Sequence, residues 1–157
     1  MEIRRIVTGH DERGRAVFKS DDKIAGTAVE TGIAEFAVAW TTNVSPADND
    51  NPFDGAKRQV GLACPGGTVA RFVEIAPGSR SPMHRTNSID YGIVLEGELD
   101  LELDDGAQKR IRAGDIVVQR GTMHAWVNNG TKPCRMVFVL IDAKPATAGG
   151  KVLNPTH

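Results

Sequence analysis

Short runs of strand-type residues, separated by turn residues, recur through the second half of this 157-residue chain. Almost no stretch has the apolar spacing of an amphipathic helix, whereas strands at intervals of roughly 8–12 residues are typical of a β-sandwich or barrel. The 17 glycines and 8 prolines supply the turns that such a fold needs. We expect strands at residues 68–76, 91–96, 98–103, 108–112, 115–119, 124–128 and 135–141.

The rest of the chain predicts additions to this set of strands. Residues 3–7 and 16–19 predict a hairpin, and residues 33–42 predict another strand. Residues 45–55 are polar and rich in turn formers, which indicates either a surface loop or a lid. We expect a single domain, with a barrel core at about residues 60–142, N-terminal strands at 1–45 that pack on or swap between barrels, and a tail at 143–157 that is mobile or packed on a partner.

One predicted strand shows a strict alternation of residue types. Residues 98–103 are Glu-Leu-Asp-Leu-Glu-Leu. Successive side chains of a strand point to opposite faces. The segment therefore predicts leucines on the core face and carboxylates in water.

The charge balance excludes a general nucleic-acid binder. Nineteen Lys and Arg residues stand against twenty Asp and Glu, for a net charge of −1, so the basic surface that phosphate backbones require is missing. No run approaches the roughly 18 apolar residues of a membrane span, and the first residues lack the apolar core of a signal peptide. Cys64 and Cys134 form no CxxC motif and fit reduced thiols. We expect a cytoplasmic protein without a membrane partner.

Two segments place a histidine where a turn meets a predicted strand. The first runs from Pro77 to Gly97 and contains, at defined spacings, Gly78, His84, Thr86, Asp90 and Gly97. The second runs from Ala113 to Asn129 and contains Gly114, Gly121, His124 and Asn128. Each half alone is a weak signal, but the two together are specific.

These spacings resemble the two motifs of the cupin superfamily, over roughly residues 60–142. In the first motif Thr86 stands where the family has a second histidine, and Asp90 stands at its acidic position. In the second motif Gln119 replaces a proline, and the first spacing is one residue short. Two segments have sequences similar to those of small single-domain cupins of secondary-metabolite pathways, which are described as oxidoreductases. These segments are SPMHRTNSIDYG and GDIVVQRGTMHAW.

The resemblance implies an all-β fold, a double-stranded β-helix or jelly-roll barrel with extra N-terminal strands. It also implies a divalent metal ion inside the barrel and a homodimer. Fe(II) is the first expectation for the ion, with Mn, Ni, Zn or Cu as alternatives. The loss of the second histidine at Thr86 predicts weaker metal binding than in four-ligand cupins, so that the site can be empty after purification.

His84, His124 and Asp90 would together form the two-histidine, one-carboxylate set of non-haem iron sites. A straight strand from His84 to Asp90 would span about 20 Å, at roughly 3.3 Å per residue, so the two can share an ion only if the chain reverses between them. The turn-forming residues between them are compatible with such a reversal. Asp90 either completes this set or bonds backbone N–H groups at a turn.

We also expect a substrate pocket lined by Trp126, Val94, Arg71 and Thr86. Trp126 shares the strand face of His124 and is either an apolar wall for the substrate or ordinary core packing. Arg71 is a candidate for holding a substrate carboxylate or phenolate, as are the other arginines near the motifs. No catalytic acid or base is assigned; the candidates are His10 and Arg85.

The predicted function is a metal-dependent enzyme that acts on a small organic molecule inside the barrel by an oxygen-dependent or other redox step. A second hypothesis keeps the metal but not oxygen, with a dehydratase, isomerase, cyclase or decarboxylase in which the ion polarises a carbonyl. A third hypothesis is a binding module that captures a small ligand without chemistry. The fold alone does not separate them, because this scaffold supports many chemistries.

Overall fold

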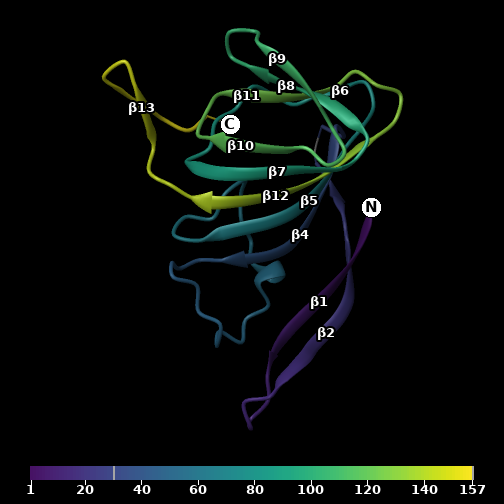
Figure 1. Cartoon of the computed structure of the whole chain (residues 1–157), viewed down its shortest axis with the longest axis vertical. Helices are drawn as coiled ribbons and strands as arrows, with labels where there is room; N and C mark the ends of the chain where they lie inside the picture. Colours follow the sequence, from purple (N-terminus) through teal and green to yellow (C-terminus); the bar gives the residue numbers. More distant parts are fainter. Residues whose placement is uncertain (30, 157) are drawn as a thin grey trace.

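The computed structural model describes residues 1–29 and 31–156, and it is built almost entirely of β-strands. Two antiparallel sheets face each other and form a barrel (Figure 1). The six-stranded sheet has, in spatial order, β10 (Ile116–Arg120), β7 (Ser88–Glu96), β12 (Cys134–Asp142), β5 (Thr68–Ile75), β4 (Ala34–Thr42) and β3 (Thr27–Ala28). The four-stranded sheet has β6 (Ser79–Arg80), β11 (His124–Asn128), β8 (Glu98–Leu103) and β9 (Gln108–Arg112). The expected all-β, jelly-roll fold is confirmed.

The core lies between the two sheets and follows the two-residue period of their strands. In β5, and in β12 as far as Ile141, every second residue is buried and the residues between are half-buried. Strand residues alternate between faces, so one side chain in two points into the barrel. The buried apolar cluster includes Val69, Val73, Ile75, Leu99, Trp126, Met136, Phe138 and Leu140.

The burial of β8 follows the expected alternation only in part: Leu101 and Leu103 are half-buried, and two of the carboxylates are not in open water. Leu99 is fully buried on the core face. Asp100 and Glu102, on the opposite face, are buried too. Asp100 accepts a hydrogen bond from Arg110 at 2.6 Å, and Glu102 accepts one from Arg80 at 2.5 Å. Arginine side chains from β6 and β9 of the same sheet therefore pair with these carboxylates, an arrangement that the alternation of one strand does not predict.

The predicted N-terminal hairpin exists and is longer than expected. Strands β1 (Glu2–His10) and β2 (Ala16–Ala25) pair along their whole length and form a two-stranded ribbon that extends away from the barrel (Figure 1). Arg5 of this ribbon contacts Asp54 at 2.7 Å, next to the 3-10 turn η1 (Gly55–Lys57). That ion pair connects the base of the ribbon to the segment that follows β4.

The segment after β12 packs on its own chain. It forms a small hairpin from β13 (Ala146–Ala148) and β14 (Lys151–Leu153), and Thr156 then pairs with Arg85. The described residues of this segment therefore form strand pairs within their own chain, whereas packing on a partner stays a prediction. Among the described residues, no helix has the length and apolar character needed to span a membrane.

Candidate functional site

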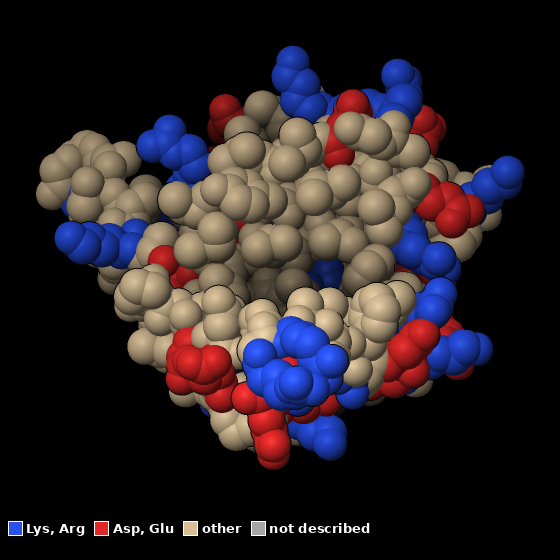
Figure 2. All heavy atoms as spheres, turned by 60° about the horizontal axis from the view of Figure 1, so that its bottom comes forward, with Lys and Arg blue, Asp and Glu red and all other residues tan. Residues whose placement is uncertain are grey.

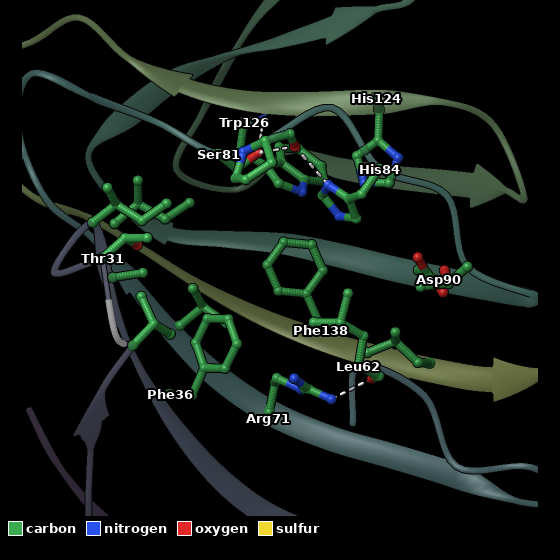
Figure 3. A pocket seen from close by; sticks show the side chains of 18 residues that line it. Thr31, Phe36, Leu62, Arg71, Ser81, His84, Asp90, His124, Trp126 and Phe138 are labelled. Atoms are coloured by element: carbon green, nitrogen blue, oxygen red, sulfur yellow. Dashed lines mark hydrogen bonds between the residues drawn. The ribbon is translucent and has the colours of Figure 1, made fainter. Parts of the chain in front are cut away.

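The two motif histidines meet inside the barrel. His84 and His124 form an isolated antiparallel bridge, in which each backbone N–H donates to the other residue's carbonyl, at 2.9 and 3.0 Å. This bridge brings the centres of the two imidazole rings to 4.2 Å from each other. The sequence predicted that these rings converge from distant segments, and the structure brings them together (Figure 3).

Backbone carbonyls orient both rings in the same way. Nδ1 of His84 lies 2.9 Å from the carbonyl oxygen of Pro82, and Nδ1 of His124 lies 2.9 Å from that of Thr122. A carbonyl oxygen only accepts, so in each neutral ring Nδ1 carries the proton and Nε2 keeps its lone pair. Burial lowers the pKa of His124 to about 4, with a smaller contribution from the nearby His84, so His124 is a neutral base at physiological pH.

Asp90 lies apart from the two imidazoles (Figure 3). Its carboxylate accepts a 2.5 Å hydrogen bond from the Ser88 hydroxyl, which leaves that hydroxyl to accept from Thr86 at 2.7 Å. This chain of hydroxyls holds the carboxylate on the six-stranded sheet, whereas His124 belongs to the opposite sheet. Burial raises the pKa of Asp90 and outweighs the opposing hydrogen bond from Ser88.

The residues do not fit the predicted three-ligand metal set. The orientation of the two rings, with a carbonyl on Nδ1 and a lone pair on Nε2, is the one that metal-binding histidines adopt. However, catalytic metal sites commonly use three protein ligands. Within residues 1–29 and 31–156, no three His, Cys, Asp or Glu side chains are grouped so as to hold an ion. The structure thus supplies two imidazoles and does not bring Asp90 to them.

A cavity of about 310 Å³ opens beside the imidazole pair. Figure 2 shows a face with a hollow near its middle, and the side chains around that hollow are mostly uncharged. Trp126 packs edge-on against His124, with ring centres 5.3 Å apart, and against Phe138 at 5.2 Å. The cavity lining is mainly apolar and includes Val29, Ile33, Phe36, Leu62, Val73, Ile75, Trp126, Phe138 and Leu140.

The polar side chains of the lining are few and come from several strands. Trp126, Arg71 and Thr86 line the cavity, as the sequence predicted for a pocket. Arg71 is only 4% exposed, and burial lowers its pKa to about 10. Among the described residues, the polar lining comprises Thr31, Arg71, Ser81, His84, Thr86, Asp90 and His124.

Three predicted site residues lie elsewhere. Val94 has the expected inward orientation, but it belongs to the packed core and does not line the cavity. His10 ends β1 at the far end of the ribbon, which extends away from the barrel (Figure 1). Arg85 directs its side chain toward the carbonyl of Asn154, at 3.5 Å, and also does not line the cavity.

Two aromatic side chains of the cavity were missed by the sequence analysis. Phe36 and Phe138 occupy β4 and β12 and face the same space as Trp126. Phe138 lies on the buried phase of β12, together with Met136 and Leu140. The alternation of that strand could have assigned it to the interior, although alternation does not separate packed core from cavity wall.

Comparison with known proteins identifies the family. The cupin domain family matches residues 71–140. The cupin-domain-containing oxidoreductase fogC of Aspergillus ruber is 41% identical over 96% of this chain and 77% of its own length. The chain belongs to the cupin family. This cupin is also 44% identical to phomopsin biosynthesis cluster protein C' of Diaporthe leptostromiformis, over 96% of this chain and 84% of the relative.

Solved structures agree with the fold. The polyketide cyclase RemF of Streptomyces resistomycificus aligns with a TM-score of 0.55 at 20% identity, over 78% of this cupin and 77% of that chain. The cupin-2 domain Rru_A2000 of Rhodospirillum rubrum aligns with a TM-score of 0.52 at 13% identity, over 85% of this cupin and 72% of that chain. At these identities the likeness supports the barrel architecture and carries no information on the reaction.

Proposed function

We propose that this cupin is an oxidoreductase of secondary metabolism that acts on a small, mainly apolar organic molecule bound in the barrel cavity. Relatives that are named cupin-domain-containing oxidoreductases align with nearly the whole chain, at 37–41% identity. The observation that carries the proposal is the imidazole pair at the cavity, with both Nδ1 atoms hydrogen-bonded to carbonyls. A mainly apolar cavity with few convergent polar groups is the usual form of a small-molecule site.

Within this proposal, the residues of the chain have distinct tasks. Nε2 of His84 or His124 accepts a hydrogen bond or a proton from a substrate hydroxyl, because its lone pair is unused within the described residues. Trp126 and Phe138 cover the apolar part of the substrate and exclude water from the imidazoles. The hydroxyl chain through Ser88 fixes the position of the Asp90 carboxyl group at the cavity.

A redox-neutral reaction is a second candidate, and one observation favours it. A neutral imidazole base and a carboxyl group with a raised pKa line the same cavity. Such a pair can remove a proton at one atom and return it at another, as isomerases and cyclases require. This candidate needs no oxidant.

The mass of the product separates the two candidates. Purified protein is incubated with a small-molecule extract of its source organism, in air and under anaerobic conditions, and the extract is analysed by mass spectrometry. The oxidoreductase proposal predicts a compound that gains or loses two hydrogens or gains oxygen; an isomer or a dehydrated product supports the alternative. The His84→Ala and His124→Ala variants should show no such change.

The same assay tests the metal dependence that the cupin resemblance implies. Activity is measured after treatment with a chelator and again after the addition of Fe(II). A loss followed by a recovery supports metal dependence. If no compound changes under any condition, while a cavity ligand can be recovered from the extract, the protein is a binding module.

A further inference from the structure

Arg71 is a buried cation at the wall of the cavity. It occupies the inward phase of β5 between Val69 and Val73, where a strand of this sheet otherwise places apolar side chains. Its guanidinium lies over the ring of Phe36, 5.2 Å from the ring centre. The residue is 4% exposed, so it has almost no contact with bulk water.

The hydrogen bonds of Arg71 leave part of its guanidinium unsatisfied. Nη2 donates to the carbonyl oxygens of Gly61, at 2.8 Å, and of Leu62. Nε is fully buried and has no hydrogen-bond partner among the described residues. An unpaired buried donor of this kind is uncommon and costs free energy, because its hydration is lost without replacement.

Arg71 also has no ion-pair partner within the described residues. Both of its partners are neutral carbonyls, and no described carboxylate lies within ion-pair distance of it. The Asp90 carboxyl group acts on Arg71 only through space, and it already accepts a hydrogen bond from Ser88. A buried charge normally has an opposite charge beside it. Because Arg71 lines the cavity, an anionic ligand bound there can supply that opposite charge.

We propose that Arg71 is an anion-binding subsite of the cavity, and that the natural ligand is a flat, apolar molecule that carries a carboxylate or another oxyanion. This inference rests on the proposed function, because it assigns a chemical class to the molecule in the same cavity. Arginine suits this role because its N–H groups form charge-assisted hydrogen bonds with planar oxyanions.

The geometry also orients such a ligand. Arg71 belongs to the six-stranded sheet and His124 to the opposing sheet. Figure 3 shows the ring of Phe138 between Arg71 and the imidazole pair. Phe138 is the direct neighbour of Arg71 across β5 and β12. A ligand whose anionic group is held by Arg71 therefore covers Phe138 and presents its opposite end to the imidazoles.

Binding of two matched probes tests the subsite. 2-Naphthoate and 2-naphthylmethanol share a two-ring body and differ in an anionic or neutral head. Isothermal titration calorimetry at pH 7 measures both dissociation constants for the wild type and for Arg71→Gln and Arg71→Lys. The control Arg110→Gln removes an arginine of β9 that is not among the residues lining the cavity. Circular dichroism and melting temperature establish that each variant is folded.

We expect the wild type to bind the naphthoate roughly 10- to 100-fold more tightly than the alcohol, as a charge-assisted hydrogen bond predicts. Arg71→Gln should reduce this preference to less than about threefold, while the affinity for the alcohol changes little. Arg71→Lys keeps the charge and should retain part of the preference, and Arg110→Gln should retain all of it.

The outcomes distinguish the subsite from the cavity itself. Equal affinity of the wild type for both probes, or an unchanged preference in Arg71→Gln, overturns the subsite and leaves the cavity proposal standing. Failure of both probes to bind the wild type overturns both. Because the wild-type comparison needs no variant, the test holds even if Arg71→Gln does not fold.

Discussion

Arg85 and Thr156 donate their backbone N–H groups to each other's carbonyl oxygens, both at 2.9 Å. On the other side of the same extended segment, the preceding residue His84 makes its two backbone hydrogen bonds with His124. The backbone that carries one imidazole is therefore held between β11 and the segment near residue 156. The chain beyond β14 thus takes part in fixing the site.

Removal of residues 154–157 should loosen the backbone at His84. Both hydrogen bonds of the Arg85–Thr156 bridge are lost, and each contributes about 1 kcal/mol to local stability. Amide exchange at Arg85, followed by NMR, should become at least about fivefold faster, since local opening controls exchange. Thr156→Ala keeps the backbone and should leave the rate unchanged. Equal protection in the truncated chain would show that β11 alone positions His84.

The meeting of the two histidines was predictable because the spacing of both segments resembles the cupin motifs, and that resemblance implies a barrel that brings the two together. Each motif places its histidine at the junction of a turn and a strand, and the two-residue period then places Trp126 beside His124. The position of Asp90 was not predictable in this way. It depends on the distance between two sheets and on the hydroxyls of Thr86 and Ser88, which no strand pattern specifies.

Parity along a strand gives the face of a side chain but not its depth in the barrel. Val94 has the inward parity that the sequence suggested, yet it lies in the packed core, whereas Phe138 lines the cavity. The burial of Arg71 depends on the carbonyls of Gly61 and Leu62, which belong to an irregular segment without periodic signal. The sequence signal that could have indicated a buried Arg71 is its position in β5, where the residues two places before and after it are apolar.

The neutral state of His124 predicts a specific loss of stability in acid. Its pKa is lowered to about 4 in the folded protein, against about 6.5 in an unfolded chain, so the unfolded state binds more protons between these values. The contribution of this residue is fully present above about pH 6.5 and falls as pH decreases toward 4, by up to roughly 3 kcal/mol. Because the pKa of Asp90 is raised in the folded protein, protonation of this carboxyl group favours the folded state as the pH falls.

Urea unfolding at pH 7 and at pH 4.5 measures this effect when the wild type is compared with His124→Gln. The difference in unfolding free energy between the two proteins should shrink or change sign at the lower pH, because the variant has no imidazole to protonate. His10→Gln, at an exposed position of the ribbon, is the matched control. A difference that stays constant with pH would show that burial does not hold His124 neutral.

Gly92 should be required for the shape of the cavity. A Cβ atom at this position would lie 2.9 Å from Cε1 of Phe138, its neighbour across β7 and β12. We expect Gly92→Ala to displace the Phe138 ring into the cavity, to destabilise the fold by about 1–3 kcal/mol, and to weaken 2-naphthylmethanol binding. Gly61→Ala, whose added methyl meets open space, should bind like the wild type. Unchanged binding by Gly92→Ala would mean that the ring moves away from the cavity.

Cobalt titration tests whether Asp90 contributes to metal binding. The imidazole pair presents two nitrogen donors, whereas the carboxylate is held apart by Ser88, so Asp90→Asn should change Co(II) affinity by less than about twofold. His84→Ala should weaken it by roughly tenfold or more, because one of two imidazole ligands is removed. Visible absorption of Co(II) reports binding and coordination number in each variant. A tenfold loss in Asp90→Asn would mean that the metal draws the carboxylate from Ser88 into the site, and the three-ligand prediction from the sequence would then describe the loaded protein.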